Sequence, residues 1–231
     1  MKRKIALGLL FIVAIIYSIH IYQTWESDVV SDLPGKIYYT KRIDGVLQLF
    51  TSNANLTNEK LIYAHSGEEN NNIGEFYYDK DINSIYFIAM KDGKWSLFSI
   101  DTKRKNPTFI QIFDGEWKDF LNYYVGTRYK NMEIINRQGS LYLMKNGKEE
   151  LLKKFIGFYD SKFNSGHTPI GFSPDGKFII YHSSEHLTPF GTLIEGMFDK
   201  DYHIGQNYIM ELETKKIEKY PALYSLQWIM E

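Results

Sequence analysis

Apolar and polar positions repeat along this chain with a period of almost fifty residues. Four runs of β-branched and aromatic residues begin 49, 47 and 46 residues apart, at 36–42, 85–90, 132–137 and 178–183. Each of the first three is followed by a glycine turn and a second apolar run, a pattern typical of β-hairpins. A third run closes each unit, at 61–64, 107–112, 149–155 and 217–220. The pattern predicts an all-β protein built from repeated small sheets.

A fourth run precedes the later units, at 76–79, 122–127 and 168–173. Four short strands in every 40 to 50 residues are typical of β-propeller blades. The first unit lacks this innermost strand, whereas the chain ends with an unpaired apolar run at 223–229. We predict that the terminal run completes the first blade, so that four four-stranded blades close with no open edge. An open half-propeller that dimerises is the alternative.

One unit carries a recognisable phrase, Gly171-Phe-Ser-Pro-Asp-Gly-Lys-Phe-Ile-Ile-Tyr181. Pro174 presets φ in the turn, Asp175 bonds to nearby backbone, and Gly176 supplies a positive φ. The phrase resembles the repeat of TolB-like and WD-repeat-like propellers. The second and third units hold diverged copies, at 78–83 and 126–131. The resemblance implies a propeller in an exported protein and carries no activity with it.

The N-terminus predicts a membrane anchor. A basic segment, residues 1–4, precedes an apolar run from Ile5 to Tyr22. An eighteen-residue helix spans about 27 Å, close to the hydrocarbon thickness of a bilayer. The positive charge keeps the N-terminus inside, so we assign 5–23 as a single-pass anchor in a bacterial cytoplasmic membrane, 24–34 as a stalk and 35–231 as an exported propeller. A cleaved signal peptide, which would release the domain, is the alternative.

Composition narrows the possible chemistry. The chain has 231 residues with 44% hydrophobic and 16% aromatic residues, enough for a substantial core. It has no cysteine, which excludes disulfides and thiolate chemistry. The net charge is −1 and the lysines are scattered, so we expect no nucleic-acid partner. No motif predicts a cofactor, a metal or a catalytic residue.

The predicted binding surface is the propeller face that points away from the membrane. It gathers the loops between blades, at 65–73, 114–120 and 157–167, together with the longest insertion, 184–206. Loops of that length are commonly functional. Candidate ligand-binding residues on this face are Trp117, Tyr159, His167, His186, Phe190, Tyr202 and His203. The simpler interpretation is that the aromatic side chains cap blade junctions and that the histidines are dispersed.

Three functions fit this pattern. The first is a binding module that presents this face to a protein or glycan partner. The second is an envelope carbohydrate-active enzyme that uses a pair of loop carboxylates, drawn from Glu68, Glu69, Asp114, Glu116, Asp160 and Glu185. The third is an accessory scaffold for a membrane partner. We favour a binding role, because no catalytic signature accompanies the carboxylates.

Overall fold

The computed structural model describes residues 28–31, 33–103, 106–115, 126–157, 159, 165–185, 205–221 and 223–230. These residues form four antiparallel four-stranded sheets. Blade 1 contains β16 (Leu226–Ile229), β1 (Lys36–Ile43), β2 (Val46–Asn53) and β3 (Lys60–Tyr63). Blade 2 contains β4 (Phe76–Asp79), β5 (Ser84–Lys91), β6 (Lys94–Asp101) and β7 (Thr108–Ile112).

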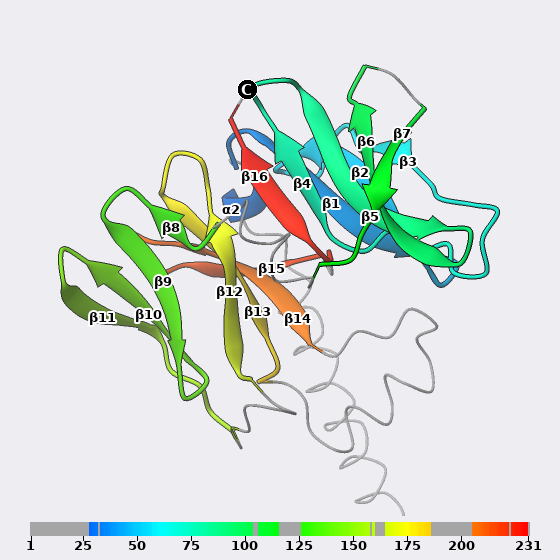
Figure 1. The fold of residues 1–231 in the computed structure, drawn as a ribbon. Helices are drawn as coiled ribbons and strands as arrows, with labels where there is room; N and C mark the ends of the chain where they lie inside the picture. Colours follow the sequence, from blue (N-terminus) through cyan, green and yellow to red (C-terminus); the bar gives the residue numbers. More distant parts are fainter. Residues whose placement is uncertain are drawn as a thin grey trace, which may run out of the picture.

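The second half of the chain repeats this order. Blade 3 contains β8 (Arg128–Tyr129), β9 (Met132–Arg137), β10 (Ser140–Lys145) and β11 (Lys148–Lys153). Blade 4 contains β12 (His167–Phe172), β13 (Phe178–Ser183), β14 (Gln206–Glu211) and β15 (Ile217–Tyr220). Figure 1 shows blades 1 and 2 on one side of the molecule and blades 3 and 4 on the other. Four such sheets fit a small β-propeller.

The C-terminal strand completes the first blade, as the sequence predicts. β16 pairs antiparallel with β1, and Lys36 lies opposite Ile229 while Tyr39 lies opposite Leu226. Most predicted strands coincide with observed ones, and β4 and β15 match to the residue. The exception is the innermost strand of blade 3, which we predicted at 122–127. Residues 121–125 lie outside the described residues, and the described strand, β8, spans only Arg128–Tyr129.

Two-residue turns set the register of the hairpins. Asp44-Gly45, Asp92-Gly93 and Gln138-Gly139 each join the second and third strands of a blade, and both residues of each turn have positive φ. That combination defines type I′ turns, whose twist matches that of the strands. The turn in blade 4 behaves as its sequence predicts. Asp175 accepts a hydrogen bond from the Lys177 N–H, and Gly176 has a φ of 74°.

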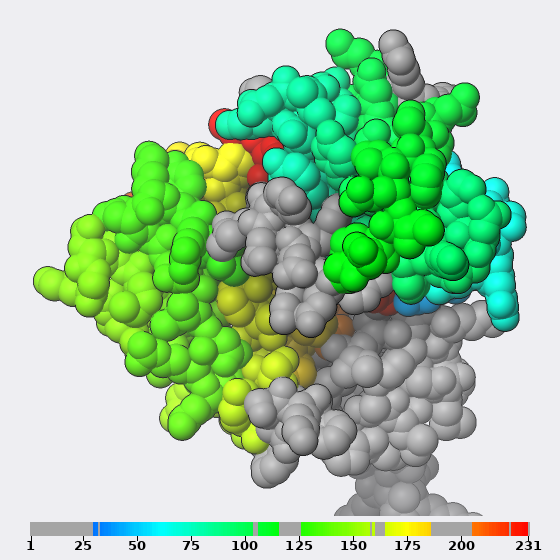
Figure 2. Space-filling view, in the orientation of Figure 1, coloured from blue at the N-terminus to red at the C-terminus, as the bar shows by residue number. Residues whose placement is uncertain are grey.

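The core lies between the sheets. Successive side chains of a strand point to opposite faces of its sheet, and therefore toward different neighbouring blades. In β1, Ile37 and Tyr39 pack toward blade 4, whereas Tyr38 packs toward blade 2. In β13, Ile180 packs toward blade 1 and Tyr181 toward blade 3. Three core clusters of described residues therefore join blade 2 to 1, blade 1 to 4 and blade 4 to 3. In Figure 2 the described residues of blades 2 and 3 form separate bulges on the near side.

Part of the predicted stalk packs against the blades. A one-turn helix, α2 (Asp28–Ser31), contacts β14 and β15, and the N–H of Val30 donates to Glu218 Oε2 at 3.0 Å. Leu33 is buried in the cluster between blades 1 and 4. The predicted anchor, 5–23, lies outside the described residues. Among the residues that the structure does describe, no helix is long and apolar enough to cross a membrane.

Candidate functional site

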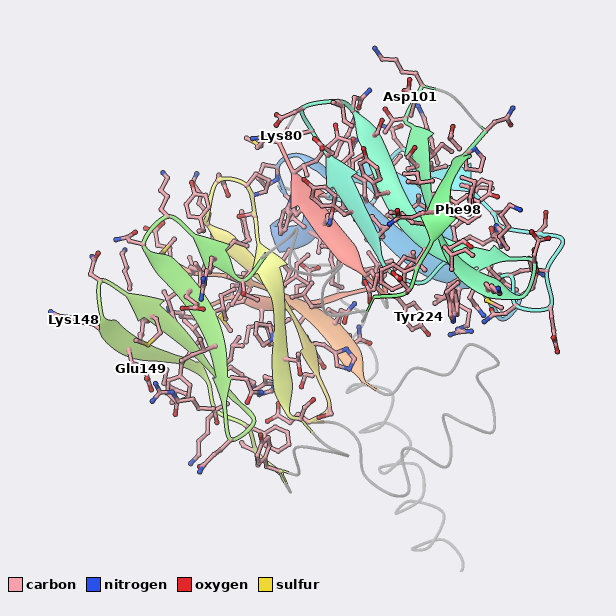
Figure 3. All side chains as sticks on the ribbon, viewed as in Figure 1. Lys80, Phe98, Asp101, Lys148, Glu149 and Tyr224 are labelled. Atoms are coloured by element: carbon pink, nitrogen blue, oxygen red, sulfur yellow. The ribbon has the colours of Figure 1, made fainter. Side chains whose placement is uncertain are left out.

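The connections between strands divide the molecule into two ends. The chain enters β1 and leaves β16 at one end, here called the termini end. The opposite end, here called the insertion end, carries the two-residue turns between the second and third strands of blades 1, 2 and 3. The strand ends that begin and finish the links between blades and the long connection from β13 to β14 also lie there. Contacts between neighbouring blades place these connections together: the His167 N–H donates to the carbonyl of Gly139, and Ser225 Oγ donates to Glu75. In Figure 3, Lys80 and Asp101 lie toward one end of the molecule and Tyr224 toward the other.

A buried histidine holds the base of the long connection. The side chain of His167 is fully buried, with Nδ1 2.9 Å from Ser183 Oγ and Nε2 3.4 Å from the carbonyl oxygen of Lys154. A carbonyl oxygen only accepts, so Nε2 carries the proton and Nδ1 accepts from the serine hydroxyl. The rings of Phe155 and Tyr181 pack edge-on against the imidazole. Burial lowers the pKa of His167, which favours its neutral form.

The Ser183–His167 pair superficially resembles an activated nucleophile, but its surroundings indicate a structural role. Ser183 is buried, and its oxygen also accepts the N–H of Glu185 at 3.2 Å. The imidazole Nε2–H is directed to a backbone carbonyl. A nucleophilic serine needs space for a reacting carbon about 3 Å from its oxygen. Because both side chains are buried, this pair holds neighbouring backbone segments together. We call His167, Ser183 and Glu185 the brace.

Glu185 extends the brace to the surface. Its Oε1 accepts the N–H of Ile156 at 3.2 Å, and its Oε2 lies 3.5 Å from Lys153 Nζ and 3.9 Å from His167 Nε2. The carboxylate thus ties the first residues of the long connection to the link between blades 3 and 4. The ion pair itself is part-exposed and contributes little to stability. Its effect is to fix where the backbone of this link lies.

That link presents apolar side chains to solvent. Ile156 is 71% exposed and Tyr159 is 38% exposed, while the intervening Gly157 lies against the ring of Phe155. The Ile156 N–H is bonded to Glu185, and the next residue, Gly157, packs on Phe155. Because its backbone is already fixed, this exposed isoleucine needs little further ordering on binding. Ile156 is not among the predicted site residues, because the sequence alone does not distinguish a single exposed apolar residue in a link from a core residue. We call Ile156, Tyr159, Lys153 and Glu185 the linker patch.

The predicted site residues fall into three groups. Tyr159 is exposed in the linker patch, and its part in binding stays a prediction. His167 lies at the start of β12 and not in the preceding link. Its side chain is fully buried as part of the brace. The remaining five, Trp117, His186, Phe190, Tyr202 and His203, lie outside the described residues. Their part in a site stays a prediction.

Two of the predicted carboxylates at this end make structural contacts. Glu68 accepts the N–H groups of Asp92 and Gly93 at 2.8 and 3.3 Å, so it caps the neighbouring hairpin turn. Glu185, the other predicted carboxylate with side-chain contacts, belongs to the brace. Within the described residues, no group of three or more histidine, aspartate or glutamate side chains is placed to hold a metal ion.

No protein-family model matches the chain. Among solved structures it is similar to TolB from Acinetobacter baumannii, with 12% identity over 85% of this chain and 45% of that one, at a TM-score of 0.30. Oligogalacturonate lyase in complex with manganese is 12% identical over 81% of this chain and 63% of its own, at 0.28. A nidogen/laminin complex is 10% identical over 83% and 63%, at 0.27. The chain thus spans less than two thirds of each of these structures.

Proposed function

We propose that this chain is a membrane-anchored interaction module that acts outside the cytoplasm and receives a protein partner at its insertion end. The observation that carries the proposal is the exposure of Ile156 on a backbone fixed by Glu185. Interface energy is concentrated in a few apolar or aromatic anchors surrounded by polar groups. The linker patch has this composition, with an isoleucine and a tyrosine beside a lysine–glutamate pair.

The position of the termini supports the proposed orientation. Lys36 is the first residue of β1, at the termini end. The segment before it packs on the domain through α2, which contacts β14 and β15, and through the buried side chain of Leu33. An anchor at 5–23 would therefore join the domain through only a few residues. The insertion end would point away from the membrane, toward partners in the envelope. The same proposal includes a closed ring of four blades, supported by the pairing of β16 with β1 and by the three packed blade junctions.

Partner capture from membranes tests the proposal. The full chain, extracted in mild detergent, should retain a discrete set of proteins that Ile156→Asp releases. Ile82→Asp is the matched control, because Ile82 is 56% exposed in a turn at the termini end. A charge buried at an interface without a partner is costly, so only the substitution at 156 should weaken capture. Equal capture by wild type and Ile156→Asp would contradict the proposal.

The anchor is tested separately by topology. The chain has no cysteine, so one introduced at an exposed position is the only thiol in the protein. A membrane-impermeant thiol reagent should label Ile82→Cys in intact cells, and alkaline washing should leave the protein in the membrane fraction. Labelling only after cell lysis would contradict export, and release by the wash would contradict the anchor.

A further inference from the structure

A hollow of about 370 Å³ opens on blade 1 at the termini end, away from the linker patch. Its lining combines two lysines with hydroxyl and amide side chains, and comprises Lys36, Thr51, Ser52, Asn53, Asn58 and Lys60. None of the described residues that line it is acidic. It shares no residue with the linker patch, so phosphate binding here does not depend on the proposed partner surface, whereas the lipid source of phosphate rests on the proposed anchor.

Strand register explains why these side chains converge. Lys36 of β1 lies opposite Asn53 of β2, and Thr51 of β2 lies opposite Lys60 of β3. Directly opposed residues project from the same face of a sheet, and residues two apart share a face. The lysines therefore project from one face of the sheet, on either side of Thr51 and Asn53. Lys36 lies in β1, Lys60 in β3, and Thr51 and Asn53 in β2 between them. The paired strands therefore fix the backbone positions from which these side chains project.

The nearest acidic residue in sequence is turned away from this face. Glu59 lies between Asn58 and Lys60, but its carboxylate accepts a hydrogen bond from Tyr39 Oη and lies 3.1 Å from Lys41 Nζ. Tyr39 and Lys41 project from the opposite face of β1, toward blade 4. The hydrogen bond from Tyr39 lowers the pKa of Glu59, so the carboxylate stays ionised where it is. Among the described residues, no carboxylate forms an ion pair with Lys60.

We propose that this hollow binds the phosphate group of an anionic ligand. Lysine ammonium groups bind phosphate as mobile point charges, and the side-chain amide of Asn58 adds an N–H donor at the rim. The hydroxyls of Thr51 and Ser52 already donate to backbone carbonyls and only shape the wall of the hollow. The hollow is wide enough for a phosphate with an attached ester. That chemistry occurs both in soluble phosphoesters and in anionic lipid headgroups. The hollow opens beside Lys36, where the chain enters β1. With the proposed anchor in a membrane, this end of the domain would lie next to the lipid headgroups.

Lysine acetylation provides a site-resolved test on the full chain. With the protein in phosphatidylcholine nanodiscs, added inorganic phosphate should slow acetylation of Lys36 and Lys60 saturably, and leave Lys80 and Lys148 unchanged. Phosphatidylglycerol nanodiscs distinguish the source of phosphate. Protection there without added phosphate identifies the lipid headgroup, whereas protection only on adding phosphate identifies a soluble ligand.

Substitution completes the test. Lys60→Gln should weaken phosphate binding, measured by calorimetry, by about tenfold, and Lys36→Gln/Lys60→Gln should abolish it. Lys80→Gln/Lys148→Gln is the control that removes the same charge from other sites. Lys60 is exposed at a strand edge, so the single variant remains informative if the double variant unfolds. Unchanged acetylation of Lys60 in every condition, or equal losses in the control, would overturn the proposal.

Discussion

The indole Nε1–H of Trp228 donates a hydrogen bond to the carbonyl oxygen of Pro34 at 2.7 Å, across 194 residues of sequence. The indole ring is buried in the cluster between blades 1 and 4, where Leu33 also lies. One side chain thus joins the last strand, the segment before the first strand and the junction that they share. The polar end of the ring positions the entering chain while its apolar body fills the core.

Replacing this side chain should therefore destabilise the whole domain. We expect Trp228→Ala to lower the free energy of unfolding by about 3–5 kcal/mol, from the lost burial and the remaining cavity. Urea unfolding measured by intrinsic fluorescence or circular dichroism would give the value. Met230→Ala, two residues later and exposed, should change it by less than about 0.5 kcal/mol. Similar effects of the two substitutions would show that β16 does not close the domain.

The strand pattern was readable from sequence because each blade repeats the same local signals. Turns such as Asp92-Gly93 require positive φ, and the flanking apolar runs leave one register that buries both faces. The unpaired run at the C-terminus predicted the strand that completes blade 1, because the first unit lacked an innermost strand. The brace could not be predicted, because it joins His167 and Glu185 of blade 4 to backbone groups of Lys154 and Ile156 in the link from blade 3. Burial of His167 likewise arises from neighbours that are remote in sequence.

Substitution of Thr40 tests whether an unpaired buried hydroxyl lowers the stability of the core. Its side chain is fully buried, and Oγ1 has no hydrogen-bond partner among the described residues. Thr40→Val keeps the shape and removes the unpaired hydroxyl, so it should raise the free energy of unfolding by about 1 kcal/mol. Thr51→Val should instead lower it, because Thr51 Oγ1 donates to the carbonyl of Ile37 at 3.0 Å. Destabilisation by Thr40→Val in urea unfolding would reveal an unrecognised partner for this hydroxyl.

His167 should make stability depend on pH. Burial holds its pKa in the folded state below the usual value of about 6.5 that applies to the unfolded chain. Above that pH the imidazole is neutral in both states, and its contribution is fully present. As the pH falls below about 6.5, the unfolded state binds the proton first, so stability drops by up to about 1.4 kcal/mol per pH unit until the folded state is protonated too.

His167→Gln isolates this contribution. Glutamine retains hydrogen-bonding capacity toward Ser183 but does not titrate, so the difference in unfolding free energy between wild type and variant should shrink as the pH falls from 7 to 5. Chemical unfolding at several pH values measures this difference. Parallel pH profiles for the two proteins would contradict a buried neutral histidine at 167.

The outer edge of blade 2 is unusually apolar. All five residues of β7 are exposed, including Phe109, Ile110 and Ile112, and the strand carries no charge, whereas β3, β11 and β15 each include charged residues. Charged side chains discourage pairing between exposed strand edges. We expect Ile110→Lys to reduce concentration-dependent self-association in sedimentation velocity. Leu61→Lys, on the already charged edge β3, should have a smaller effect, and equal effects would remove β7 as the associating edge.

The most direct test of the proposed function compares the two ends of the molecule by photo-crosslinking. A thiol-reactive benzophenone would be attached to Ile156→Cys or Ile82→Cys in the otherwise cysteine-free full chain, and irradiated in native membranes. We predict discrete crosslinked proteins from position 156 that are absent from position 82. No crosslinks from 156, or the same bands from both positions, would contradict a partner surface at the insertion end.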